Sequence, residues 1–354
     1  MENEIMRDNV ELVEKFNAEP ISKVKGLPDF YTFNNGLIYS HRDFDKFMER
    51  LKKGEPSAIV SGLNASGTIH IGHKAVFDTN LFFQRKYGVP VFIPISDDES
   101  YVSKKVESQE EAFKNAKLLA KDMLALGFDP KNTFIIIDQI FTNIYNLAIK
   151  LSRHITMSEV KAIYGYKNEE NVGLHFYPAV QSAHVVLPFE LKKISNILVP
   201  IGPDEDAHLR AARDMAARCG YPKPAVVHSK FMPGVDGQKM SKSKNNAIFY
   251  HDSEAEIKKK VTIAFSGGAK TIEEHKKSGG NPEIDVACLY LAGYFLNKDE
   301  GERLFNDYRS GKLLSGDVKK MLLKSLLIDI GNFKNAFEKL TEKEVESALL
   351  KNER

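Results

Sequence analysis

Short apolar runs alternate with longer segments of mixed polarity through the first two thirds of the chain. Residues 57–61, 89–95, 133–138 and 197–201 are almost continuously apolar, which is typical of strands buried on both faces. Strands separated by helical segments are usually parallel, because a helix must carry the chain back to the same end of the sheet. The pattern therefore predicts an α/β, Rossmann-like domain with a mainly parallel sheet.

Helical periodicity fills the gaps between these runs. Residues 108–126 place Phe113, Leu118 and Met123 on one apolar face, and Gly127 follows as a helix-ending residue. Further helices are expected directly after a glycine-containing loop at residues 62–67, running to residue 87, and over residues 206–219.

After residue 250 the pattern changes to charged segments with helical periodicity. Short S-G-G, S-G-G-N and S-G-K connections join the predicted helices at residues 254–264, 282–296, 300–310 and 316–340. We therefore expect an N-terminal segment (1–56), a Rossmann-like domain (57–250) on which it packs, and a small C-terminal α-helical domain (251–354) packed on its own apolar stripes.

Composition narrows the class of protein further. The 354 residues are 42% hydrophobic, and 50 basic against 48 acidic side chains leave a formal charge of +2, so any nucleic-acid surface must be a local patch. Cys219 and Cys288 lack neighbouring ligand residues, so neither a disulfide framework nor a metal site is expected. A charged N-terminus and the lack of a long apolar run predict a cytoplasmic protein without a membrane span.

One candidate phosphate-binding segment lies where a strand should pass into a helix. It reads S-G-T-I-H-I-G-H and includes Ser66, Gly67, His70, Gly72 and His73. Backbone N–H groups and the positive end of the helix dipole attract phosphate there, and imidazoles three positions apart share one face. Gly72 leaves room for a base or ribose to approach the backbone. Taken alone, the segment is also compatible with two surface histidines beside a glycine turn.

A second candidate segment, K-M-S-K-S, follows a stretch rich in Pro and Gly. It consists of Lys239, Met240, Ser241, Lys242 and Ser243. Ammonium groups on such a loop can swing onto a polyphosphate and neutralise the charge that grows as pyrophosphate departs. A solvated basic turn is the alternative for any lysine run.

Together the two segments resemble the paired motifs of class I aminoacyl-tRNA synthetases in order and separation. By that resemblance, His70, Gly72 and His73 line ATP, while Lys239 and Lys242 stabilise the departing pyrophosphate. These five residues are the core of the expected nucleotide site, and the histidines and lysines are its expected catalytic residues.

Other positions complete the ATP-binding set that the resemblance implies. G-P-D at residues 202–204 follows a predicted strand, where open sheets place ligands, and Gly202 and Asp204 are expected to hold the ribose. The remaining expected ATP contacts are the other members of the two motifs, Ser66, Gly67, Met240, Ser241 and Ser243.

Residues 177–184 (Y-P-A-V-Q-S-A-H) bear on the choice of amino acid. Tyrosine-specific members of class I resemble Y-x-x-x-Q-x-x-D, whose final carboxylate accepts a hydrogen bond from the substrate phenol, whereas this chain has His184. Tryptophan instead offers one indole N–H, a pure donor that needs a buried acceptor. The absence of the carboxylate therefore favours tryptophan.

Glu99 is the expected acceptor. It lies in S-D-D-E after the second apolar run and resembles the T-D-D-E segment of tryptophanyl enzymes, although a solvated acidic loop, or less often a metal site, is the alternative for such a segment. Gln181 and Glu205 complete the expected tryptophan-binding set, with Glu205 at the substrate ammonium group.

The resemblance to tryptophanyl-tRNA synthetases of the archaeal and eukaryotic type covers about residues 36–330. Y-S-H-R-D at 39–43, A-F-S-G-G at 264–268 and T-I-E-E-H at 271–275 belong to it, and the last also has the spacing of a helix capping box. Val60 and Pro94 depart from it, since they stand where that family has a tyrosine and a glutamine.

The resemblance implies a ligase that uses ATP and Mg²⁺ to convert L-tryptophan to tryptophanyl-adenylate, releases pyrophosphate and transfers tryptophan to tRNA(Trp). It further implies a homodimer whose C-terminal helices bind the anticodon arm, with Lys258, Lys259 and Lys260 as candidate RNA contacts. Three alternatives stay open: a tyrosyl-tRNA synthetase, a synthetase-like RNA-binding module without aminoacylation, and another adenylate-forming nucleotidyltransferase.

Overall fold

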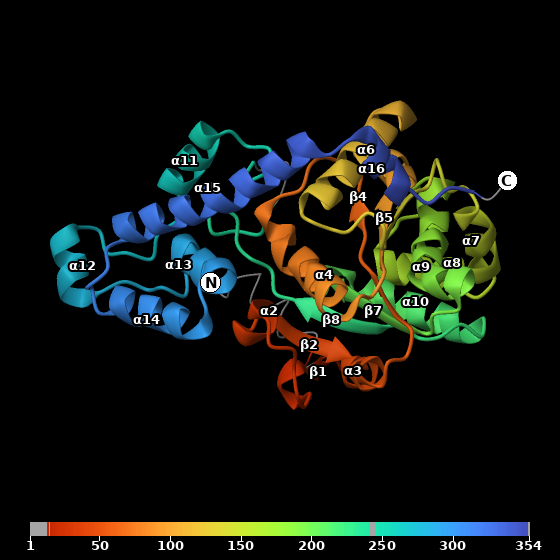
Figure 1. The fold of residues 1–354 in the computed structure, drawn as a ribbon, viewed down its shortest axis with the longest axis horizontal. Coiled ribbons are helices and arrows are strands. Elements are labelled where there is room, and N and C mark those ends of the chain that lie inside the picture. The colour runs from red at the N-terminus through yellow and green to blue at the C-terminus, as the bar shows by residue number, and fades with distance from the viewer. Residues whose placement is uncertain (1–12, 14, 241–244, 353–354) are drawn as a thin grey trace.

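The computed structural model of the chain describes residues 13, 15–240 and 245–352. Figure 1 shows a sheet-based body beside a helical extension that carries α12 and α14, with the long helix α15 running from the extension to the body. The strands are β1 (Glu19–Pro20), β2 (Ile38–Arg42), β3 (Ser57–Val60), β4 (Leu63–Asn64), β5 (Val91–Ser96), β6 (Thr133–Ile137), β7 (Asn196–Ile201) and β8 (Ala225–Ser229).

Helices connect and cover these strands. The α-helices are α2 (Tyr31–Asn34), α3 (Phe44–Lys52), α4 (Lys74–Tyr87), α5 (Asp97–Val102), α6 (Gln109–Ala125), α7 (Ile144–Ser152), α8 (Met157–Tyr164), α9 (Val172–Lys192), α10 (Asp206–Arg218), α11 (Glu254–Ile263), α12 (Ile272–Ser278), α13 (Val286–Tyr290), α14 (Lys298–Arg309), α15 (Ser315–Lys339) and α16 (Glu342–Ala348). Short 3-10 turns are η1 (Ile21–Lys23), η2 (Ile71–His73) and η3 (Pro203–Glu205), and η4 (Leu291–Phe295) is a π-helical turn.

The sheet is mainly parallel, which confirms the predicted fold class. Its strand order is β1-β2-β8-β7-β3-β5, with β4 and β6 also paired to β5. β1 and β2 attach antiparallel at the β8 edge, and the remaining pairs are parallel. From β3 the chain builds outward through β5 to β6, then returns to the other side of β3 through β7 and β8. The direction of winding reverses at β3, where open sheets bind their ligands.

Successive side chains of the central strands alternate between two hydrophobic clusters. Ile59 packs on one face with residues of α3, α4 and α6, while its neighbours Ala58 and Val60 pack on the other with α7, α9 and α10. Burial on both faces explains why these strands are continuously apolar in sequence.

Three helix predictions need correction. Residues 68–70 are not helical, because the chain passes through an extended stretch and η2 before α4 begins at Lys74. Leu118 is 37% exposed, because α6 turns Ala112, Ala116 and Leu119 toward the sheet instead. The helix predicted over residues 282–296 is α13 followed by η4, whose wider turn ends at Leu296.

The N-terminal segment joins the sheet through β2. Its Arg42 pairs with buried Asp206 at the start of α10, with Nε 2.7 Å from Oδ1, and His228 of β8 lies 3.0 Å from the same carboxylate oxygen. Ser40 contacts the other nitrogen of His228 at 2.9 Å. Two segments far apart in sequence are therefore held together by one buried carboxylate, whose removal would leave a guanidinium without its partner.

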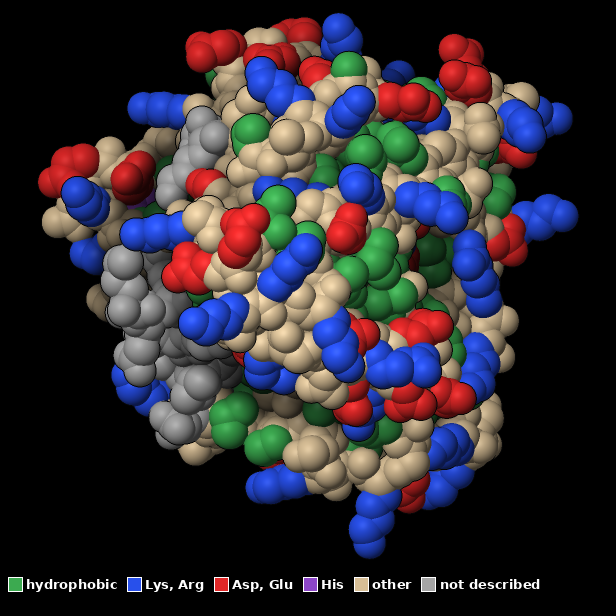
Figure 2. All heavy atoms as spheres, turned by 90° about the vertical axis from the view of Figure 1, so that its left-hand side faces the viewer, with side chains coloured by type: hydrophobic (Ala, Val, Ile, Leu, Met, Phe, Trp, Pro, Cys, Tyr) green, Lys and Arg blue, Asp and Glu red, His purple; other side chains and the backbone are tan. Residues whose placement is uncertain are grey.

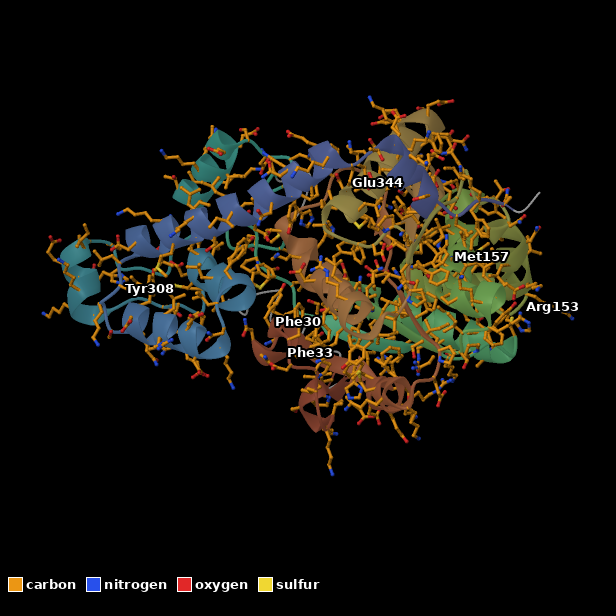
Figure 3. The ribbon with its side chains drawn as sticks, in the orientation of Figure 1. Phe30, Phe33, Arg153, Met157, Tyr308 and Glu344 are labelled. Carbon is orange, nitrogen blue, oxygen red and sulfur yellow. The ribbon has the colours of Figure 1, made fainter. Side chains whose placement is uncertain are left out.

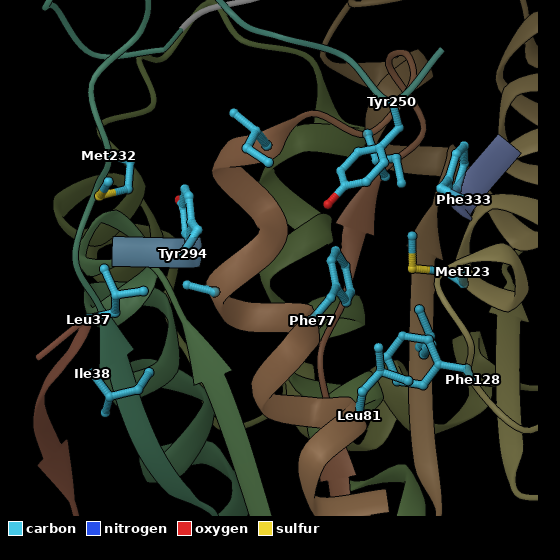
Figure 4. Close-up of a cluster of buried hydrophobic side chains, with 14 of the residues drawn as sticks. Leu37, Ile38, Phe77, Leu81, Met123, Phe128, Met232, Tyr250, Tyr294 and Phe333 are labelled. Carbon is cyan, nitrogen blue, oxygen red and sulfur yellow. The ribbon is translucent and has the colours of Figure 1, made fainter. Parts of the chain in front are cut away.

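The core continues across the predicted boundary near residue 250. Figure 4 shows Phe77 of α4 and Met123 of α6 in the same cluster as Tyr250, Tyr294 and Phe333. The division at residues 57–250 and 251–354 stays a prediction, and the later helices do not pack solely on their own apolar stripes.

The chain end returns to the sheet. The Leu350 N–H donates to the Ile135 carbonyl at 2.8 Å, so the residues after α16 cover the outer edge of β6. Within the described ranges, the structure contains no helix that combines the length and the apolar character needed to cross a membrane.

A polar network organises the helical extension. Tyr308 of α14, labelled among these helices in Figure 3, donates to Asp285 at 2.7 Å, and the same carboxylate accepts the Gly267 N–H at 3.0 Å. Thr271 caps α12 by accepting the Glu274 N–H, as the capping-box spacing predicts. The A-F-S-G-G and T-I-E-E-H segments thus have structural roles here.

Candidate active site

Three loops meet at the carboxyl ends of the parallel strands around β3. Ser66 to His73 follow β3 and β4, Asp97 to Val102 form α5 directly after β5, and Gly202 to Glu205 follow β7. Because parallel strands end at the same edge of a sheet, segments from distant parts of the sequence are brought to one edge. The loops at this edge contain the histidine motif, Glu99, Gly202, Asp204 and Glu205, while Gln181 comes from α9 and Lys239 and Met240 from the segment after β8.

The two histidines of the first motif lie side by side. Their ring centroids are 3.9 Å apart and the ring planes are tilted by 31°, so the two imidazoles are neighbours as their spacing predicts, although His70 is the N-cap of η2 and neither residue lies in α4. The Gly72 N–H donates to His70 Nδ1 at 3.1 Å, and the His70 N–H donates to His73 Nδ1 at 3.2 Å. Because both Nδ1 atoms accept hydrogen bonds, a neutral ring carries its proton on Nε2 in each case.

Met240 of the second motif lies directly over the first. A Cβ atom built on Gly72 would stand 2.8 Å from Met240 Sδ and 2.9 Å from the His70 ring. The chain leaving the lysine segment also contacts this region, since Ile248 accepts the Ile71 N–H at 2.9 Å. The absence of a side chain at Gly72 therefore lets Met240 pack closely on the histidine segment. Ser241, Lys242 and Ser243 lie outside the described residues.

Lys239 connects the lysine segment to the loop after β7. Its ammonium group lies 3.5 Å from Asp204 and 4.2 Å from the centroid of the Phe231 ring. Gly202 lies beneath, where an added Cβ would come within 2.8 Å of the Asp204 carboxylate. The predicted ATP residues Gly202, Asp204 and Lys239 are thus neighbours.

A pocket of about 290 Å³ opens beside this nucleotide edge. Glu99, Gln181 and Glu205, the predicted tryptophan-binding residues, all line it, as do Val60 and Pro94. Its aromatic lining consists of Tyr164, Tyr166, Tyr177, His184 and His208. A pocket with aromatic walls and several polar groups is typical of a site for a small organic molecule.

Glu99 reaches the pocket but already has an ion pair. The residue is 8% exposed, and Lys105 Nζ lies 2.9 Å from Oε1 and 3.3 Å from Oε2. The sequence-based alternative of a solvated loop is therefore wrong for Glu99, since its carboxylate is turned inward.

Gln181 and Glu205 form a second polar group in the pocket. Gln181 Nε2 donates to Glu205 Oε2 at 3.0 Å, and His208 Nδ1 lies 2.9 Å from the same oxygen. The Tyr164 hydroxyl donates to Gln181 Oε1 at 2.8 Å. Burial opposes ionisation of Glu205, but the contacts with His208 and Gln181 outweigh it and lower its pKa. The carboxylate therefore stays charged in the pocket.

Helix α9 supplies one wall of the pocket. Tyr177, Gln181 and His184 lie on one helical face because they are spaced by four and three residues. The Tyr177 hydroxyl donates to Ser96 at 3.0 Å and thus ties this wall to the end of β5. Three side chains of the sequence segment 177–184 therefore line the pocket.

Three carboxyl groups lie behind this wall. Oxygen atoms of Asp97, Asp98 and Asp138 lie within 4.8 Å of one another, a spacing that a cation would accept. Protein donors already occupy much of it: the Asp138 N–H and Gln139 bind Asp97, and His184 Nε2 lies 2.7 Å from Asp138. We therefore read the cluster as protein hydrogen bonding and not as a metal centre.

Sequence patterns missed several residues of this site. Tyr164 stacks on His208 with ring centroids 4.0 Å apart, and Lys105 pairs with Glu99, yet neither belongs to a recognisable motif. Asp138 could have been noticed as a polar residue that directly follows an apolar strand. The other two carry no such signal, because their roles arise from tertiary contacts.

Comparisons with known proteins agree on one family. Residues 52–327 match the model described as tRNA synthetases class I (W and Y). The chain is 36% identical to a tryptophan–tRNA ligase of Methanocaldococcus jannaschii over 95% of the chain and 93% of that protein. It is 34% identical to the cytoplasmic human tryptophan–tRNA ligase over 91% of the chain and 71% of that protein.

Solved structures show the same likeness. The tryptophanyl-tRNA synthetase from Giardia lamblia superposes with a TM-score of 0.88 at 32% identity, covering 99% of both chains. The enzyme from Aeropyrum pernix gives a TM-score of 0.89 at 29% identity, over 98% of this chain and 97% of that chain. The similarity therefore spans both the sheet-based body and the helical extension.

Proposed function

Because the chain belongs to the class I tRNA synthetases of the tryptophan and tyrosine family, and is a tryptophan–tRNA ligase within it, we propose that its two motif segments and the adjoining pocket form one catalytic site. The site activates L-tryptophan with ATP and then transfers it to tRNA(Trp). The observation that carries the proposal is the packing of Met240 on Gly72, since it brings the lysine segment against the histidine segment. The pocket that holds Glu99, Gln181 and Glu205 opens beside them.

The nucleotide side works by positioning and charge neutralisation. Nε2–H groups of His70 and His73 donate to phosphate oxygens, and Gly72 admits the nucleotide against the backbone. Gly202 and Asp204 hold the ribose, with Ser66 and Gly67 in the loop after β4 at the same edge of the sheet. In-line attack of the tryptophan carboxylate on the α-phosphate forms the mixed anhydride and expels pyrophosphate, so no covalent enzyme intermediate is needed.

The lysine segment neutralises the leaving group. Lys239 lies at Asp204 before ATP binds and is released from this pair by the stronger charge of the triphosphate. Lys242 is assigned the same role at the departing pyrophosphate, and Met240, Ser241 and Ser243 are assigned as further ATP contacts. Mg²⁺ enters as part of the Mg·ATP substrate and supplies further charge compensation, and we assign it no protein ligand.

The amino-acid side binds the two ends of tryptophan separately. Glu205 Oε1 has no hydrogen-bond partner among the described residues and accepts the substrate ammonium group, while Gln181 holds the Glu205 carboxylate in place. Aromatic side chains and Val60 enclose the indole ring. Glu99 was predicted to accept the indole N–H, but that role must compete with Lys105.

The helical extension is proposed to meet the anticodon arm of tRNA. Figure 2 shows Lys and Arg scattered among Asp and Glu on the face that this end of the molecule presents. Lys258 and Lys259 are exposed on α11, whereas Lys260 pairs with Asp252 at 2.7 Å and is less suited to RNA. A homodimer and a cytoplasmic location are proposed by analogy with the family and with the cytoplasmic relatives.

ATP–pyrophosphate exchange with tryptophan and tyrosine in parallel tests the proposal. We expect exchange with tryptophan to exceed that with tyrosine by at least about 100-fold, because His184 stands where tyrosine-specific members of the class carry the carboxylate that binds the phenol hydroxyl. Faster exchange with tyrosine would assign the site to the other specificity of the family. Exchange with neither amino acid would favour an RNA-binding module without aminoacylation.

A further inference from the structure

His184 has one nitrogen fixed by the protein and the other directed to the pocket. The residue is 3% exposed, and its Nε2 lies 2.7 Å from Asp138 Oδ1. Its Nδ1 has no hydrogen-bond partner in the described part of the chain. It is also not among the fully buried polar atoms that lack a partner, so Nδ1 is accessible from the pocket. Since His184 lines the pocket, Nδ1 is the polar atom that it offers to a ligand.

The other polar groups of the pocket are less suited to accept a proton from an indole. Both oxygens of Glu99 lie within 3.3 Å of the Lys105 ammonium group, a stronger donor than a neutral N–H. Gln181 Oε1 already accepts from Tyr164. Tyr166 is partly exposed, so water competes for its hydroxyl, and Val60 offers no acceptor.

We propose that Nδ1 of His184 accepts the indole N–H of tryptophan, and that Asp138 is the positioning residue that holds the Nε2–H tautomer this requires. The inference deepens the proposed function and rests on it. Indole is a pure donor, so it selects the ring form whose proton points to Asp138. Tyrosine-specific enzymes have a carboxylate at this position of the helix to bind a phenol. In this chain His184 supplies a neutral acceptor there instead.

The buried surroundings of His184 keep the imidazole ring neutral. Burial lowers the pKa of His184 to about 4, so the ring is neutral at physiological pH. Burial, together with the charge of Asp138, raises the pKa of Asp98 well above its usual range. Burial also raises the pKa of Asp138 well above its usual range, although the neighbouring Asp98 opposes part of this rise. The tautomer therefore rests on geometry: Asp138 Oδ1 lies 2.7 Å from Nε2 and is the oxygen that accepts Nε2–H in the proposed complex.

The experiment compares tryptophan with 3-benzothienylalanine, in which sulfur replaces the indole N–H. The readout is the ratio of kcat/KM for the two amino acids in ATP–pyrophosphate exchange by the full chain. We expect the unmodified protein to favour tryptophan by at least about tenfold, because the analogue leaves the buried acceptor unpaired. A general loss of activity or folding lowers both values and leaves the ratio unchanged.

Two variants of His184 separate its two nitrogens. His184→Gln places an amide donor near Asp138 but no acceptor at the Nδ1 position, so the ratio should fall to near one. His184→Asn places an amide oxygen near the Nδ1 position and should retain part of the selectivity. Glu99→Gln and Tyr166→Phe are the matched controls and should keep the full ratio. Unchanged selectivity in His184→Gln, or its loss in Glu99→Gln, would overturn the assignment.

Nitrogen NMR of the unmodified protein keeps the inference testable if His184→Gln does not fold. With ¹⁵N-labelled histidine, tryptophan should shift the His184 Nδ1 resonance and benzothienylalanine should not. Equal shifts would overturn the inference. Normal exchange with tryptophan but a ratio near one in the unmodified protein would overturn it while leaving the proposed function intact. Absence of exchange with tryptophan would overturn both.

Discussion

The nucleotide side and the amino-acid side of the site are assembled in different ways. The nucleotide side consists of short continuous segments, in which His70, Gly72 and His73 contact one another and Met240 packs on top. The pocket instead collects single side chains from α5, α9 and the loop after β7, together with Lys105. The continuous segments bind ATP, which is the same substrate whichever amino acid is activated. The dispersed pocket side chains can be substituted one at a time, which can alter the choice of amino acid. We therefore expect substitutions on the nucleotide side to affect catalysis with any amino acid, and substitutions in the pocket to affect the choice among them.

Removal of a histidine from the nucleotide side should have the largest effect. We expect His73→Ala to lower kcat in ATP–pyrophosphate exchange by a factor of about 100 to 1,000, because one donor to the charged transition state is lost. The KM for tryptophan should change little. His154→Ala is the control, since His154 contacts Arg218 through its backbone carbonyl. A rise in the KM for tryptophan with normal kcat would contradict the claim that the nucleotide side affects catalysis and the pocket affects amino-acid binding.

Gly72→Ala should have the next largest effect. The added methyl group would meet Met240 Sδ at 2.8 Å and the His70 ring at 2.9 Å, so one of the two segments must move. Overpacking of this kind costs about 1–3 kcal/mol, which corresponds to a loss of about 5- to 150-fold in kcat/KM for ATP. Steady-state exchange at varied ATP measures it. Gly331→Ala on α15, where an added Cβ meets nothing within 4 Å, should retain full activity.

Glu205→Gln should have a smaller and more selective effect. The charge that faces the substrate ammonium group is lost, so we expect tryptophan to bind about tenfold more weakly while the KM for ATP is unchanged. Because the chain contains no Trp, the fluorescence of added tryptophan reports its binding with little protein background. Glu170→Gln, at an exposed position, is the control. Equal affinity in both variants would remove Glu205 from the pocket.

The smallest predicted change is with pH. The preference for tryptophan over benzothienylalanine should be constant from about pH 5.5 to 8, because His184 takes up a proton and loses its acceptor only as the pH approaches its lowered pKa of about 4. Exchange assays of both amino acids across this range give the ratio. A preference that disappears below about pH 6.5 would show that His184 titrates as an exposed histidine does.

Sequence patterns predicted the parts of this molecule that depend on local order. Buried strands such as β6 are continuously apolar because both faces are covered, and Thr271 caps its helix at the spacing that the sequence shows. The extended stretch before α4 was missed because residues 69–71 pair with residues 248–250 after the lysine segment, a contact between distant parts of the sequence.

The pocket was only partly predictable for the same reason. Glu99, Gln181 and Glu205 line one pocket, but the ion pair from Lys105 to Glu99 and the contact from Asp138 to His184 depend on how α5, β6 and α9 pack. The sequence around Glu99 and His184 does not show that Glu99 already accepts from Lys105 while His184 Nδ1 has no such donor. The roles of the site residues therefore stay predictions, and the competition between Glu99 and His184 became visible only in three dimensions.

The most direct test of a shared site is to identify the adenylate that the enzyme forms. The purified chain is incubated with Mg·ATP, inorganic pyrophosphatase and an equimolar mixture of the standard amino acids, and the protein-bound product is released and analysed by mass spectrometry. The account predicts tryptophanyl-adenylate as the dominant product, and its loss in His73→Ala. Tyrosyl-adenylate, or no adenylate at all, would contradict the claim that this pocket and these motifs act together on tryptophan and ATP.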